Sequence, residues 1–221
     1  MFKLLSTGNP KTLKGEKQGY MTYIMHLAPY DLGGKNVCPK ATPGCIAGCL
    51  NTAGRGGMFK KGENTNTIQK ARIRKTQYFF ADRDAFMKDL VIDITKAIKQ
   101  ASKKGFVPVF RLNGTSDLSW EKYTVNGQNI FELFPDVQFY DYTKVLGRKI
   151  SQYKNYHLTF SNAESNMLDV LEALKQGMNV ATVFDKLPEV WRGRTVINAD
   201  ESDLRFLDPK GGYVIGLRAK G

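Results

Sequence analysis

The sequence has few cysteines, few histidines and none of the common nucleotide-binding or hydrolase motifs, and each shortage excludes a class of function. Its 221 residues include only three cysteines and two histidines, His26 and His157. So few histidines disfavour Ser–His chemistry, and three closely spaced cysteines do not form a disulfide framework. The patterns G-x-S-x-G, G-x-x-x-x-G-K-[ST] and G-x-G-x-x-G are absent. Their absence disfavours an α/β-hydrolase, a P-loop nucleotide triphosphatase and a Rossmann enzyme.

Long apolar runs are also missing. No segment approaches the roughly 18 apolar residues of a membrane span, and residues 1–20 lack the continuous apolar run of a signal peptide. We therefore expect a cytoplasmic protein with no membrane partner. The formal net charge of +12 predicts attraction to nucleic acid or to an anionic small molecule, although a solvated basic face would give the same composition. The oligomeric state stays open.

From residue 20 onwards, apolar strands alternate with helical segments. We expect an N-terminal lead over 1–19 and a single α/β domain over 20–221, with a cysteine-rich loop at 37–57. Helical spacing over 68–105 predicts two helices broken near 81–84, the second capped by Asp82. The alternation favours a mainly parallel sheet, arranged as a partial or irregular (β/α) barrel.

The three cysteines all lie in the loop that follows the first predicted strand. Cys38, Cys45 and Cys49 have the spacing C-x6-C-x3-C, and Pro39 and Pro43 prevent a helix between the first two. Three thiolates can hold a [4Fe-4S] cluster with one iron left free, or a zinc ion with a further ligand from a histidine. Buried cysteines without a metal are the remaining alternative. A metal site, with the cluster ahead of zinc, is the economical interpretation.

Several predicted strands change abruptly from apolar to polar at their carboxyl ends, as in RLNGTSD at 111–117. Parallel strands that end in this way open onto a site. If the ends converge beside the cysteine loop, their side chains would contact a cofactor or substrate, although caps and buried ion pairs are alternatives for some of them. His157 begins a strand, so we expect it at the end of the sheet opposite the cysteine loop, in a structural role. The candidate cofactor-binding residues are Asn113, Thr115, Asp117, Asp141, Lys144, Ser161 and Glu164; no catalytic residue is assigned.

Five stretches together resemble a phage and plasmid protein family called gene product eighty-eight. They are CPKATPGCIAGCLNTAGRG, RLNGTSD followed by Trp120 and Glu121, FYDYTK, HLTFSNAESN and DLRFLDP. The resemblance covers nearly the whole chain from residue 20 and implies a protein encoded by a phage or plasmid and acting in the host cell.

The cysteine loop, with Pro-Gly before its second cysteine, more distantly resembles that of radical-SAM-like proteins. That resemblance implies a partial (β/α) barrel in which three cysteines hold a [4Fe-4S] cluster. The free iron would take the amino and carboxylate groups of S-adenosylmethionine, whose cleavage gives a 5′-deoxyadenosyl radical. Residues 113–117 would then lie near the methionine amino group. The resemblance does not identify the substrate, and the net positive charge favours a nucleotide or nucleic acid.

A second hypothesis is a non-catalytic nucleic-acid-binding phage protein whose three cysteines hold a structural zinc. On one predicted helix, aromatic and basic side chains alternate, and such aromatics can stack on bases. On a helix they are more often part of the core. The side chains concerned are Arg72, Arg74, Lys75, Tyr78, Phe79 and Phe80.

Overall fold

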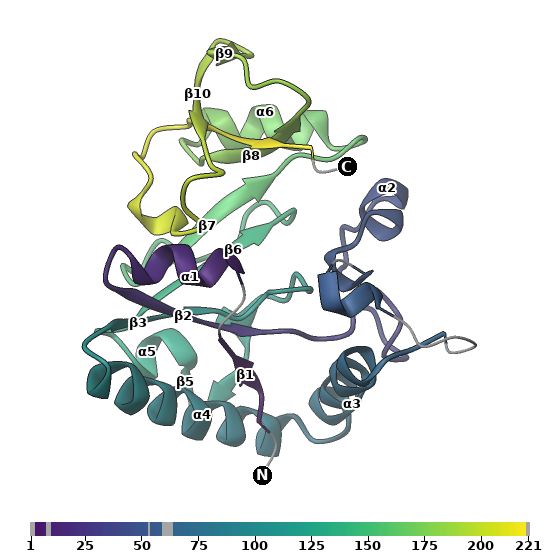
Figure 1. The fold of residues 1–221 in the computed structure, drawn as a ribbon, viewed down its shortest axis with the longest axis vertical. Helices are drawn as coiled ribbons and strands as arrows, with labels where there is room; N and C mark the ends of the chain where they lie inside the picture. The colour runs from purple at the N-terminus through teal and green to yellow at the C-terminus, as the bar shows by residue number, and fades with distance from the viewer. Residues whose placement is uncertain (1–2, 8–9, 53, 59–63, 220–221) are drawn as a thin grey trace.

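The computed structural model describes residues 3–7, 10–52, 54–58 and 64–219. Its centre is a nine-stranded sheet in the order β1-β2-β3-β6-β7-β8-β11-β10-β9 (Figure 1). The strands are β1 (Leu5–Ser6), β2 (Tyr20–Met25), β3 (Val107–Arg111), β6 (Gln138–Thr143), β7 (Tyr156–Ser161), β8 (Val180–Phe184), β9 (Val190–Trp191), β10 (Arg194–Asn198) and β11 (Val214–Arg218). A separate hairpin joins β4 (Thr124–Val125) to β5 (Gln128–Asn129).

Seven consecutive strands of the large sheet are parallel, and only the edge strands β1 and β9 are antiparallel to their neighbours. This arrangement confirms the predicted α/β class and mainly parallel sheet. From β2 to β8 the strands lie side by side in chain order, and β11 is then inserted before β10. Among the described residues β1 and β9 do not pair with each other, so the sheet is open and not a closed barrel.

The helices are α1 (Pro10–Glu16), α2 (Pro43–Ala47), α3 (Thr67–Ala81), α4 (Arg83–Lys103), α5 (Ile130–Leu133) and α6 (Met167–Lys175). The predicted break between α3 and α4 is confirmed, because the Asp82 side chain accepts a hydrogen bond from the Ala85 N–H at 2.9 Å and caps α4. No helix of the described chain is long and apolar enough to cross a membrane.

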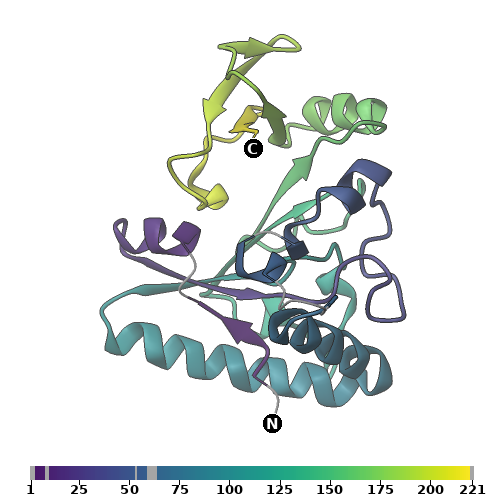
Figure 2. The same ribbon diagram turned by 45° about the vertical axis from the view of Figure 1, so that its right-hand side comes forward.

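Helices cover the two faces of the sheet unequally. The apolar face of α4 packs through Phe86, Leu90 and Ile94 against β2 and β3 in the largest core cluster, while α1 lies on the opposite side of the same strands (Figures 1 and 2). Toward the other end, α6 packs on β7, β8 and β11 through a second cluster. The predicted lead is part of this structure, because Leu5 pairs with Met25 of β2.

The carboxyl ends of β2, β3, β6 and β7 share one edge of the sheet because these strands are parallel. The chain leaves β2 at this edge and enters the cysteine loop. Three short 3-10 turns, η1 (Leu50–Thr52), η2 (Gly54–Gly57) and η3 (Trp120–Lys122), also follow strands that end here, and η4 (Arg205–Leu207) precedes β11. The fold therefore places the cysteines and the polar strand ends along one edge.

Candidate metal and ligand site at the cysteine loop

Each cysteine of the loop is free and half-buried. Thr42 precedes α2, and its hydroxyl accepts a hydrogen bond from the Cys45 N–H at 3.2 Å, so the threonine caps the short helix that bears Cys45. Gly48 ends that helix, and Cys49 follows it. The short helix therefore contains Cys45 but not Cys49.

Burial sets the protonation of two of the thiols. It raises the pKa of Cys38 to about 11, with a smaller contribution from the neighbouring Cys49, Asp117 and Cys45. The pKa of Cys49 is also raised by burial. The Cys38 sulfur accepts a hydrogen bond from the Tyr30 N–H at 3.4 Å and contacts the Thr115 carbonyl at 3.7 Å. A buried thiolate needs a compensating positive charge, which a bound metal supplies.

Two cations lie beside the thiols. The Lys144 ammonium donates to the Cys45 sulfur at 3.5 Å, and the positive charge of Arg72 opposes the effect of burial on Cys49. Arg72 is held by Asn51, which accepts two hydrogen bonds from its guanidinium, at 2.7 and 3.2 Å. Its Nε is buried and has no hydrogen-bond partner among the described residues. The sequence predicts Arg72 only as part of a nucleic-acid surface, because nothing local to it shows that α3 packs against the loop.

Zinc and a [4Fe-4S] cluster require different distances between the three cysteine sulfurs. In the described part of the chain, no group of three or more His, Cys, Asp or Glu side chains is arranged to hold a metal ion. Zinc–sulfur bonds of about 2.3 Å would bring the three sulfurs within about 4 Å of one another. A four-iron cube binds its thiolates at separate corners and holds them further apart. The three thiols interact electrostatically and have two cations beside them, but in the described chain they are not gathered into a metal site.

The two histidines considered as a fourth zinc ligand lie in different places. His157 is the second residue of β7, so it lies at the amino edge of the sheet, away from the cysteines, as the sequence predicted. His26 follows β2 at the cysteine edge. Burial, with the charges of Arg72, Arg111 and Lys75, lowers the pKa of His26 to about 3. His26 is therefore neutral at pH 7 among three cations.

Two of the predicted cofactor-binding carboxylates position the loop. Glu164 accepts hydrogen bonds from the Thr42 hydroxyl and the Gly44 N–H, both at 2.7 Å, so it holds the start of α2. These hydrogen bonds lower the pKa of Glu164. Asp117 accepts from the Thr143 hydroxyl and the Lys144 N–H, both at 2.8 Å, and thereby fixes the residue that contacts Cys45.

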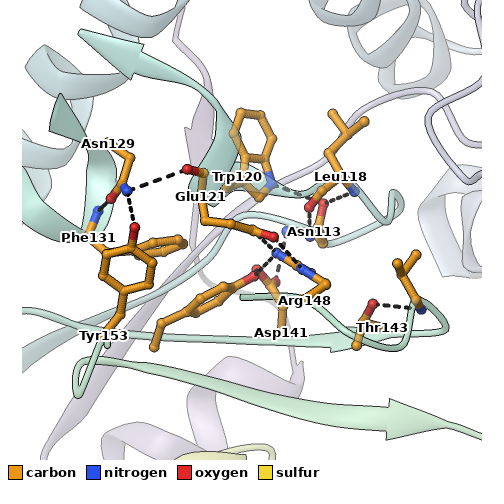
Figure 3. Close-up of polar contacts among 12 residues, drawn as sticks. Asn113, Leu118, Trp120, Glu121, Asn129, Phe131, Asp141, Thr143, Arg148 and Tyr153 are labelled. Carbon is orange, nitrogen blue, oxygen red and sulfur yellow. Dashed lines mark hydrogen bonds and ion pairs between the residues drawn. The ribbon is translucent and has the colours of Figure 1, made fainter. Parts of the chain in front are cut away.

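Asn113, which follows β3, and Asp141 of β6 belong to a buried polar network (Figure 3). Asn113 Oδ1 accepts from the Ser116 hydroxyl, the Leu118 N–H and the Trp120 indole at 2.9–3.0 Å. Asp141 accepts from the Asn113 N–H at 2.8 Å and from the Tyr156 hydroxyl at 3.2 Å. Burial raises the pKa of Asp141 to about 7. The polar atoms of both side chains are satisfied within the chain.

The remaining predicted residues differ in whether their side-chain polar atoms already have hydrogen-bond partners. The Thr115 hydroxyl donates to the Leu27 carbonyl at 2.5 Å, which ties the end of β2 to the loop after β3. Ser161 ends β7 at the cysteine edge and is half-buried. Next to it, Asn162 has a buried side-chain oxygen without a donor among the described residues. Of the predicted residues, Lys144 and Ser161 retain polar atoms for a ligand, and Asn162, which was not predicted, retains its side-chain oxygen.

Of the three aromatics that could stack on bases, Tyr78, Phe79 and Phe80, the middle one belongs to the core. Phe79 is fully buried and makes edge contacts with Phe86 and Trp120 at ring-centroid distances of 5.2 and 5.6 Å. It does not reach a base on the surface, which agrees with the core alternative for these aromatics.

The comparisons with known proteins concern the family alone. The family model described as Gene product 88 matches residues 3–221. No curated protein and no solved structure matched the chain.

Proposed function

The chain belongs to the Gene product 88 family, and from the geometry of its cysteine loop we propose that it is an iron–sulfur protein of the radical-SAM type. One observation supports this most strongly: three free, half-buried thiols follow the first parallel strand, with the Lys144 ammonium 3.5 Å from one of them. Cys38, Cys45 and Cys49 would hold a [4Fe-4S] cluster and leave one iron for S-adenosylmethionine. Reduced clusters of this type supply single electrons, here for cleavage of the sulfonium.

The chain's own residues would balance charge and fix the loop. Lys144 and Arg72 offset the negative charge that three thiolates bring into a half-buried site. Glu164 holds the helix that bears Cys45, and Asp117 holds the backbone of Lys144. These contacts fix the start of the helix that bears Cys45 and the backbone of the lysine beside it.

For the methionine part of S-adenosylmethionine, we propose contacts at the ends of β6 and β7. The buried Asn162 oxygen lacks a hydrogen-bond donor among the described residues, and an amino group supplies one. The Lys144 ammonium is suited to a carboxylate. Asn113 and Asp141 support this edge from behind, because their polar atoms are already engaged.

The strand order supports the same proposal. Strands β2, β3, β6, β7 and β8 lie side by side in chain order and run parallel. An open sheet of this kind is compatible with the partial (β/α) barrel implied by the radical-SAM resemblance, with the cysteine loop after its first strand. The substrate would be anionic, a nucleotide or nucleic acid, given the net charge of +12.

Anaerobic purification with visible absorption and iron, sulfide and zinc analysis tests the proposal. We expect a brown protein with about four irons per chain, and loss of colour and iron in Cys38→Ala, Cys45→Ala and Cys49→Ala. Lys144→Gln should lose iron faster to a chelator, whereas Lys144→Arg, which keeps the charge, should resemble the wild type. Addition of S-adenosylmethionine should change the electron paramagnetic resonance signal of the reduced protein.

The alternative is a nucleic-acid-binding protein with a structural zinc. It rests on the charge of +12, and it predicts colourless protein with one zinc and salt-dependent binding to DNA or RNA. That outcome would overturn the iron–sulfur proposal. A brown protein whose electron paramagnetic resonance signal does not change when S-adenosylmethionine is added would support the cluster but overturn the proposed binding of S-adenosylmethionine.

A further inference from the structure

A groove lies at the amino edge of β6 and β7, opposite the cysteine loop. Residues 144–155 connect these two strands without a helix, so this part of the edge lacks the cover that a crossover helix provides. Two adjoining cavities occupy the space, of about 450 and 430 Å³. They share five lining residues: Ile150, Ser151, Tyr156, His157 and Lys210. Cavities of this size accommodate small-molecule ligands.

The charge of the groove has one sign. Lys154, Lys210 and His157 line the second cavity, and no Asp or Glu of the described chain lines either one. Among the described residues, the Lys154 and Lys210 ammonium groups and the Ser151 hydroxyl make no hydrogen bond or ion pair. The other described cation in the lining, Arg148, is already paired with Glu121 at 2.5 Å. Two free lysines and a hydroxyl remain to bind an anion.

The two cavities differ in chemistry. Apart from the shared residues, the first is lined by the apolar side chains of Val145, Leu158 and Met178 and by the polar side chains of Arg148, Gln176 and Asn179. The second contains the two lysines, with Phe206 and Tyr153 beside them. A ligand that fills both would have an anionic end and an apolar end.

We propose that this groove is a binding site for a phosphate monoester with a compact apolar or aromatic group. The phosphate lies in the cavity lined by Lys154 and Lys210, and the uncharged group lies against Ile150, Leu158 and Met178. The lysine end of the groove is separate from the cysteine loop, since His157 lies near the start of β7 and Ser161 ends the strand at the cysteine edge.

His157 provides a reporter within the groove. Burial, with the charges of Lys210 and Arg205, lowers its pKa to about 4, and Lys154 lines the same cavity. A phosphate bound there would favour the protonated imidazole, so the pKa of His157 should rise. The chain has only one other histidine, His26, and the variant His157→Gln assigns the two signals in a proton spectrum.

Calorimetric titration with phenyl phosphate tests the proposal, with phenol and inorganic phosphate as the separate halves of the probe. We expect phenyl phosphate to bind more tightly than either half, and the double variant Lys154→Ala/Lys210→Ala to bind it at least about tenfold more weakly. Lys99→Ala, which removes an exposed lysine of α4, is the matched control and should bind as the wild type does.

Several results would overturn the site. They are no binding of phenyl phosphate at millimolar concentration, equal loss of affinity in the Lys99 control, or a His157 pKa that phenyl phosphate leaves unchanged. The titration is repeated on protein with alkylated cysteines. Binding that persists there keeps this proposal independent of the iron–sulfur assignment.

Discussion

Replacing Asp141 by asparagine tests whether this candidate residue is a buried structural carboxyl. Asp141 is fully buried, and its oxygens accept from the Asn113 N–H and the Tyr156 hydroxyl. An asparagine keeps the first hydrogen bond, and its amide can donate to the tyrosine hydroxyl, which also accepts. The substitution therefore removes the ionisable group and preserves the shape, and it reverses the direction of the hydrogen bond with Tyr156.

The expected effect follows from the pKa. Burial raises the pKa of Asp141 from 3.8 to about 7. Between these values the folded protein retains a proton that the unfolded chain releases, so this group lowers the free energy of unfolding as the pH rises from about 4 to about 7. At about 1.4 kcal/mol for each pH unit, the loss amounts to about 4 kcal/mol. The Asp141→Asn variant has no ionisable group at this position, so its free energy of unfolding does not decrease for this reason.

Urea unfolding of both proteins from about pH 4 to about pH 8 measures the effect. The difference in unfolding free energy, variant minus wild type, should increase by about 4 kcal/mol across this range. Other titrating groups are common to both proteins and cancel in the difference. A difference that stays constant with pH would refute the raised pKa and the structural role derived from it.

Three further predictions concern other parts of the fold. Burial lowers the pKa of His157 to about 4, so the neutral imidazole stabilises the fold above about pH 6.5 and this contribution is lost on acidification. In urea unfolding, the free energy of unfolding of His157→Gln should therefore fall less than that of the wild type between pH 6.5 and 4. A methyl group at Gly114 would lie 2.5 Å from a side-chain carbon of β2, so Gly114→Ala should cost about 1–3 kcal/mol in thermal unfolding, whereas Gly15→Ala, with contacts of 3.4 Å or more, should not. Glu164 accepts two hydrogen bonds at the start of α2, so Glu164→Ala should speed amide hydrogen exchange over residues 43–47. The control Glu172→Ala removes a hydrogen bond to Gln176 at the end of α6 and should leave the exchange of 43–47 unchanged.

Local patterns were sufficient for much of the architecture. The break between α3 and α4 follows from the capping chemistry of Asp82, which depends on neighbours three residues away. The parallel sheet follows from the alternation of strands and helices. The polar residues at strand ends predicted the shared edge, because parallel strands necessarily bring their carboxyl ends together.

The roles of individual polar residues did not follow from such patterns. Asn113 and Asp141 have the same sequence signature as Lys144 and Ser161, a polar residue at a strand end. In the structure the first two are engaged in a buried network, while Lys144 contacts a thiol. The partners lie 28 residues apart for Asn113 and Asp141 and 99 residues apart for Lys144 and Cys45, beyond the reach of any local rule.

The sequence by itself determined that three thiols lie in an irregular loop after a strand, because proline restricts the backbone and thiols have limited chemistry. It also determined the order of the main strands and of helices α3, α4 and α6, because periodicity is a local property of the chain, but it did not predict α1, α5 or the β4–β5 hairpin. Only the tertiary structure decided that Arg72 lies beside Cys49 and that β11 precedes β10 in the sheet. It alone decided the groove beneath 144–155. These features depend on how distant segments pack, and their energies come from burial and charge that exist only once the chain has folded.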